Sequence, residues 1–137
     1  MRRNHGFGGV PLDPLALSRT DCSAVIDAAV EAGLRHLAEG RSVMLYSALG
    51  PAADRGGELD AASGGRHRLG RSLGRIQAGL VARAGLRRAL IAGGDTSRHA
   101  LEKIGIATLT LRMPLPQTPG SSLCVALGAR ATGWKSR

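Results

Sequence analysis

Stretches of apolar residues at helical spacing alternate along the chain with short apolar runs, and this alternation limits the possible folds more than any other feature. A glycine follows each helical stretch, which is typical of a helix end. Parallel strands need crossover segments, which helices usually supply, so the order predicts an α/β layered fold with a mostly parallel sheet flanked by helices. The helices and strands are expected in turn at 25–37, 43–47, 69–81, 87–94, 100–104 and 107–113.

The composition is consistent with one domain whose core is aliphatic. The chain has 137 residues, 43% of them hydrophobic, but only one Phe, one Tyr and one Trp. The stretch 50–70 has the composition of turns and is expected to be a disordered loop. Cys22 and Cys124 lack metal-ligand spacing, and neither a leader nor a membrane-spanning run is visible, so a cytoplasmic protein is expected.

The stretch "ALIAGGDTS" at 89–97 carries the strongest chemical signal. Here an apolar run meets two glycines, an acid and two hydroxyl residues, and a helical stretch follows. Glycines let a ligand approach the backbone, and the free N–H groups of a helix start attract anions. A phosphate or nucleotide would therefore fit, although a plain turn with a capping residue explains the pattern equally well. The candidate ligand-binding residues are Gly93, Gly94, Asp95, Thr96 and Ser97.

Three other polar residues are candidates beside this turn. Ser47 ends the 43–47 run and would lie on the same rim of the sheet if the two strands are neighbours, or would be an ordinary strand-end hydroxyl. His99 lies within the turn and helix, where it could approach a phosphate, although a surface position is the simpler expectation, and His67 lies within the loop. Within the turn itself, Asp95 is the candidate metal ligand.

Positive charge is concentrated in the second half of the chain. The net charge is +9, and residues 63–137 hold thirteen basic side chains against only Asp95 and Glu102. A solvated arginine-rich surface is the simplest explanation. A basic nucleic-acid-binding protein using residues 63–88 is the alternative function, but aromatic residues that stack on bases are not interleaved there.

Several motifs together resemble the nucleotide-binding C-terminal domain of the four-carbon acid sugar kinases. The "GGDTS" turn and the later "PGSSLC" are the most specific of them. The resemblance extends from residue 6 to residue 124 and rests on "GF", "PLDPLAL", "VMLYSALGP", "LGRIQAGLVARAGLRRALIAGGDTS", "IGIATLTL" and "PLPQTPGSSLC".

The resemblance implies an ATP-dependent kinase that phosphorylates a hydroxyl of small sugar acids of the threonate or erythronate type. Gly93, Gly94, Asp95 and Thr96 match the family's glycine-rich ATP-binding turn. The implied ligands are ATP with Mg²⁺, and the sugar acid would need a separate substrate-binding domain. The residues identify no catalytic base, and no membrane partner is expected.

The sequence departs from the family pattern at both ends. The family's first strand with its Gly-Ser turn, and a Lys-Gly-Gly loop near the end, have no counterpart here. Residues 1–124 are therefore expected to form a partial nucleotide-binding domain truncated at both ends, and residues 125–137 an atypical, disordered tail. Such a chain could be inactive alone or a non-catalytic remnant.

Overall fold

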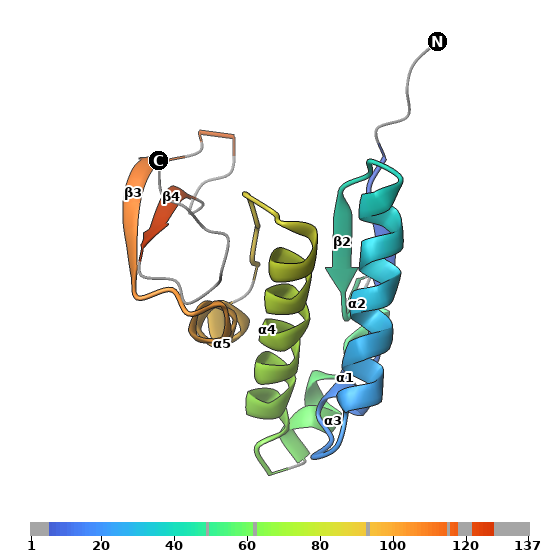
Figure 1. Cartoon of the computed structure of the whole chain (residues 1–137). Coiled ribbons are helices and arrows are strands. Elements are labelled where there is room, and N and C mark those ends of the chain that lie inside the picture. The colour runs from blue at the N-terminus through green and yellow to red at the C-terminus, as the bar shows by residue number, and fades with distance from the viewer. Residues whose placement is uncertain are drawn as a thin grey trace.

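The computed structural model describes residues 6–48, 50–61, 63–92, 94–114, 116–117 and 122–127. Within them, about half of the chain is helical and the strands are short. Figure 1 shows helix α4 between two parts of the molecule, with α2 and β2 on one side and α5, β3 and β4 on the other. The elements in chain order are β1 Gly8–Pro11, α1 Pro14–Leu17, α2 Ser23–Ala38, β2 Val43–Tyr46, the 3-10 helix η1 Pro51–Ala53, α3 Gly56–Ala61, α4 Gly65–Ala84, α5 Gly94–Ile104, β3 Thr108–Pro114 and β4 Ser122–Leu127.

The described strands form two separate pairs instead of one sheet. β1 pairs in parallel with β2, Gly8 opposite Val43, and α1 and α2 form the crossover between them. β3 pairs antiparallel with β4, with a register shift between Leu111 and Met113. The α/β class is confirmed. The described residues do not form the single, mostly parallel sheet that was expected.

The apolar run at 87–94 was wrongly predicted to be a buried strand. Residues 86–92 have no regular structure, and the side chain of Leu90 is 84% exposed. A strand needs a neighbour to receive its backbone hydrogen bonds, and an apolar run alone does not supply one. α4 therefore continues into an irregular segment, which leads to α5.

The core lies between α2, α4 and the β1–β2 pair. Leu17 and Ile76 are completely buried within it. The approach of α2 to α4 is close, because a β-carbon on Gly33 would lie 2.8 Å from a methyl carbon of Leu80. An ion pair between Arg83 and Glu31, 2.7 Å long, also joins these two helices at the surface. The buried cluster comprises Val10, Leu12, Leu17, Cys22, Ile26, Ala29, Val30, Ile76 and Leu80.

A buried polar contact joins α4 to the segments before α2. The hydroxyl of Ser72 donates a hydrogen bond to the carbonyl oxygen of Leu17, 2.7 Å away. Its oxygen lies 3.3 Å from the sulfur of Cys22. Because the only hydroxyl proton of Ser72 goes to Leu17, the thiol of Cys22 is the donor in the second contact. This thiol is therefore a structural group of the core.

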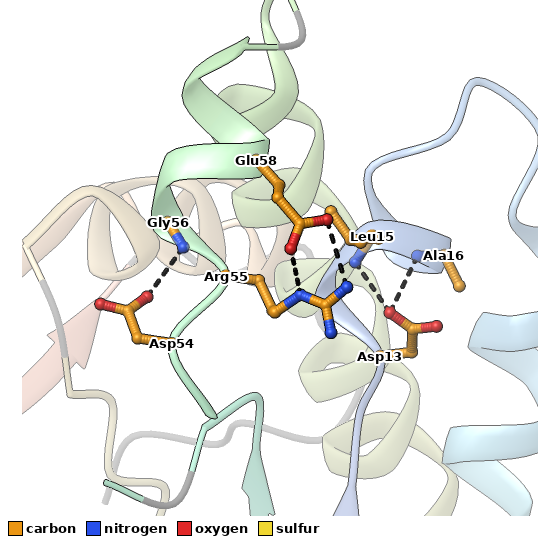
Figure 2. A network of polar contacts seen from close by, with 7 residues as sticks. All are labelled: Asp13, Leu15, Ala16, Asp54, Arg55, Gly56 and Glu58. Carbon is orange, nitrogen blue, oxygen red and sulfur yellow. Dashed lines mark hydrogen bonds and ion pairs between the residues drawn. The ribbon is translucent and has the colours of Figure 1, made fainter. Parts of the chain in front are cut away.

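The stretch 50–70, expected to be a disordered loop, contains η1, α3 and the first turn of α4. Asp54 accepts a hydrogen bond from the backbone N–H of Gly56 at 2.8 Å, so its carboxylate satisfies a free donor at the start of α3. Arg55 donates to both carboxylate oxygens of Glu58, at 2.5 and 3.1 Å (Figure 2). This contact raises the pKa of the Arg55 guanidinium above its ordinary value. These local contacts stabilise regular structure in a stretch whose composition predicted a disordered loop.

The short helix α1 is also capped by an acid. Asp13 accepts hydrogen bonds from the backbone N–H groups of Leu15 and Ala16, at 2.9 and 3.3 Å (Figure 2). Pro14 begins the helix, which suits a residue with no N–H to donate. The "PLDPLAL" motif thus contains the end of β1, the capping residue Asp13 and the single turn of α1, which places Leu17 in the core.

Candidate nucleotide-binding site

The "GGDTS" stretch does lie at the start of a helix. Gly94 is the first residue of α5, whose eleven residues end at Ile104. Gly93 lies outside the described residues, and so do the side chains of residues 95–97. The predicted helix is confirmed, but it begins at Gly94 instead of 100, so residues 94–97, which were expected to form a turn before the helix, are helical. An irregular segment, and not a paired strand, comes before it.

Two glycines of α4 set the position of α5. A β-carbon on Gly70 would lie 2.6 Å from the ring of His99, and one on Gly74 would lie 2.9 Å from its carbonyl oxygen and 3.0 Å from the Cα atom of Ala100. Any side chain at Gly74 would therefore push against the backbone of α5. Ala100 and Ile104 are buried in this contact region. The glycines, four residues apart, form a groove that fixes the helix following the candidate turn.

His99 is held in this groove, so the expected surface position was wrong. Its side chain is only 13% exposed, and its ring meets the ring of His67 edge to face with 4.5 Å between centroids. The Nδ1 atom is buried with no hydrogen-bond partner among the described residues. The nearest carboxylate oxygen, on Glu102, is 3.8 Å away. The spacing of Gly70 and Gly74 was the signal in the sequence that could have indicated this burial.

Ser47 is not placed beside the turn by any described contact. It follows β2 directly and is half-buried. Figure 1 shows β2 and α5 on opposite sides of α4, and between the parts of these two elements that are described there is no contact. The expected shared rim depended on a strand at 87–94 that does not form. A nucleotide-binding role for Ser47 therefore stays a prediction.

Neither a metal centre nor a membrane segment is found in the described parts of the chain. In those parts, no three His, Cys, Asp or Glu side chains gather as they would to hold a metal ion. The side chain of Asp95 is not among the described groups, so its proposed role as a metal ligand is untested. Within the same residues, no helix has the length and apolar character needed to cross a bilayer.

The expected domain limits also stay predictions. β4 runs through the expected boundary at Cys124 and continues to Leu127, so the first residues of the expected tail belong to a strand. Residues 128–137 lie outside the described residues.

Comparison with curated proteins found two kinases that resemble the chain. It is 36% identical over 136 residues to a 3-oxo-isoapionate kinase of Paraburkholderia graminis, an alignment that covers 93% of this chain and 28% of the relative. It is 34% identical over 127 residues to a 3-oxo-tetronate kinase of Cupriavidus necator, covering 91% of this chain and 27% of that protein. The chain thus spans less than a third of these relatives, and no solved structure gave a significant match.

A comparison with protein families gave a match over nearly the whole chain. Residues 2–135 match the family described as "Nucleotide-binding C-terminal domain". The match includes the "GGDTS" turn and both strands that follow α5. The chain belongs to the nucleotide-binding C-terminal domain family.

Proposed function

We propose that this chain is the ATP-binding portion of a kinase that phosphorylates four-carbon sugar acids of the threonate or erythronate type. Family membership supports nucleotide binding. The names of the two relatives, a 3-oxo-isoapionate kinase and a 3-oxo-tetronate kinase, support the class of reaction. The structural observation that carries the proposal is that α5 begins at Gly94.

A helix that begins in the glycine turn offers what a nucleotide phosphate needs. The first N–H groups of a helix have no partner within it, and the helix dipole places partial positive charge at that end. α5 is long enough for a developed dipole, and Gly94 has no β-carbon to obstruct the approach of a phosphate. The residues present therefore fit a phosphate group. Gly93, Asp95, Thr96 and Ser97 complete the proposed turn.

Mg²⁺ is proposed as the companion of ATP. It is usually held by the substrate's phosphates and one or two carboxylates, and when bound it neutralises charge that develops on the transferred phosphoryl group. Asp95 is the proposed carboxylate because it directly follows the glycine pair. In this scheme the chain's own contribution is to bind and orient the phosphates through the start of α5. No described residue is assigned as the base that activates the sugar acid, which we propose to bind on a separate domain.

Calorimetric titration of the purified chain with Mg-ATP tests the proposal. Gly94→Asp should abolish measurable binding, because it puts a carboxylate where the phosphates would bind. An acid in the first turn suits the helix dipole, so α5 should still form. Gly57→Asp is the matched control, since it adds the same charge to the first turn of α3, where a β-carbon on Gly57 meets no atom within 4 Å.

The two variants also separate nucleotide binding from general attraction to polyanions. Binding through the basic surface should weaken steeply with added salt, should survive Gly94→Asp, and should respond equally to both substitutions. Equal ATP affinity in Gly94→Asp and Gly57→Asp would contradict a nucleotide site at the turn.

A further inference from the structure

The β3–β4 pair stands apart from the other elements. Within the part of the chain that the structure describes, neither strand contacts another helix or strand, and Figure 1 shows the pair across α4 from α2 and β2. A pair of strands is at best marginally stable in water unless a further strand or a helix packs against it. No described element does so here, and the pair therefore needs a further surface to cover it.

The residues of β3 are patterned to bury one face of the pair. The stretch "TLTL" at 108–111 alternates polar and apolar residues, as a strand does when one face lies on a core and the other faces water. Successive side chains of a strand point to opposite faces, so Leu109 and Leu111 share one face. These leucines are nevertheless 48% and 61% exposed. The apolar face is thus present without the surface that its pattern requires.

The face is too small to hold a freely diffusing partner. β3 has seven residues, so with about 3.4 Å per residue and about 4.8 Å per strand the pair covers roughly 230 Å². Stable complexes of separate proteins bury about 800 Å² on each partner. A domain tethered by the same polypeptide needs much less, because the tether gives it a high effective concentration. The size of the face therefore favours a second domain of one polypeptide over a separate protein or a second copy of this chain.

The two relatives contain the length for such a domain. The region that matches this chain makes up 28% of one kinase and 27% of the other, so most of each polypeptide lies outside it. We propose that the apolar face at Leu109 and Leu111 is the docking surface for the sugar-acid-binding domain of the kinase. Arg112, exposed on the same strand and without an ion-pair partner among the described residues, would pair with an acidic side chain at the edge of that domain. The proposal rests on the proposed function, because that function requires the separate domain.

A chimeric kinase tests the docking surface. In the chimera, this whole chain replaces the matching region of the Cupriavidus necator 3-oxo-tetronate kinase, whose remaining part supplies the second domain. Leu109→Thr with Leu111→Thr makes the face polar while keeping residues that favour strands. The control is Met44→Thr with Leu90→Thr, which removes two equally large side chains that are exposed elsewhere. Thermal melts compare both double variants in the chimera and in the isolated chain, and ADP release measures phosphorylation of 3-oxo-tetronate.

The two contexts should give different results. In the isolated chain both double variants should melt within about 2 °C of wild type, because substitutions of exposed residues have small effects. In the chimera the melting temperature of the Leu109/Leu111 variant should be lower than that of the control by about 3 °C or more, because two leucines lose a buried contact. Its phosphorylation of 3-oxo-tetronate should fall as well, while Mg-ATP binding by the isolated chain should stay unchanged.

The outcomes separate this proposal from the proposed function. A loss confined to the Leu109/Leu111 variant of the chimera supports the docking surface. Equal melting of the two variants in the chimera, or a loss of the same size in the isolated chain, overturns it and leaves the nucleotide turn standing. A chimera that shows the selective loss but releases no ADP supports the docking surface and contradicts the proposed function. A chimera without a cooperative melt overturns the docking surface, because the second domain then does not recognise this chain.

Discussion

Gly74 of α4 lies directly against the backbone of His99 on α5, so that a β-carbon on Gly74 would be 2.9 Å from the carbonyl oxygen of His99. Contacts this short are not tolerated, and here the obstacle is the backbone of a helix, which cannot rotate away as a side chain can. The packing of α5, and with it the position of the candidate turn, therefore depends on the missing side chain of Gly74.

The first prediction is that Gly74→Ala destabilises the protein and weakens Mg-ATP binding. Overpacking costs about 1–3 kcal/mol, while alanine returns up to about 1 kcal/mol of helix propensity. Gly57→Ala is the control, because it gives a comparable helix gain in α3 with no atom within 4 Å of the new carbon. Urea unfolding should show Gly74→Ala to be the less stable of the two. Equal stability would mean that α5 is not held by this contact.

The second prediction compares two large aliphatic residues that the sequence pattern treats alike. Ile76 is completely buried, whereas Leu90 is 84% exposed. Ile76→Ala should lower the free energy of unfolding by about 2–5 kcal/mol, and Leu90→Ala should change it by no more than about 0.5 kcal/mol. Chemical denaturation of both variants checks this. A large loss for Leu90→Ala would indicate that the segment is buried after all.

The helices were largely predictable from the sequence, because the signal for an amphipathic helix is local. Apolar residues at three- and four-residue spacing indicated α2, α4 and α5, and Gly85 and Gly105 marked two of the ends. α4 nonetheless begins four residues before Leu69, since its first turn lies in a glycine-rich stretch without apolar periodicity.

The strands were less predictable, because pairing depends on residues far away in the sequence. The runs at 43–47 and 107–113 became β2 and β3, but the first pairs in parallel and the second antiparallel. The equally apolar run at 87–94 did not become a strand. The residues of such a run do not determine whether a neighbouring strand is available to pair with it.

The candidate site was predictable only where it depends on a local turn. Glycines followed by an acid and hydroxyl residues indicated that a helix comes next, but α5 already begins at Gly94, six residues earlier than the expected 100. The burial of His99 was missed because it comes from the fit between two helices.

The third prediction concerns the buried hydroxyl of Ser72. Ser72→Ala removes the donor to the carbonyl oxygen of Leu17 and the acceptor for the thiol of Cys22. Leaving such buried groups unpaired should cost about 1–3 kcal/mol. Ser63→Ala, at an exposed position, is the control and should be close to neutral. Thermal melts of both variants measure the difference, and a neutral Ser72→Ala would show that Leu17 and Cys22 find other partners.

The fourth prediction is a dependence of stability on pH. Arg66 donates hydrogen bonds to Asp60, one of them 2.9 Å long, and this contact lowers the pKa of the Asp60 carboxyl. A group whose pKa is lowered by folding stabilises the protein above its unfolded pKa of about 3.9, and this contribution is lost as the pH falls through the folded pKa. Because both side chains are more than half exposed, the effect should be small and should weaken with salt.

Asp60→Asn isolates this contribution. At neutral pH the melting temperature of the variant should be slightly below that of wild type. This difference, the gap between the two melting temperatures, should close as the pH falls from about 7 to about 2, because the Asp60 carboxylate of wild type is then protonated and loses the same charge. Asp27→Asn is the control, since Asp27 is exposed on α2 and has no ion-pair partner among the described residues. A gap that stays constant down to the lowest pH would show that the substitution destabilises the fold for a reason other than the lost carboxylate charge.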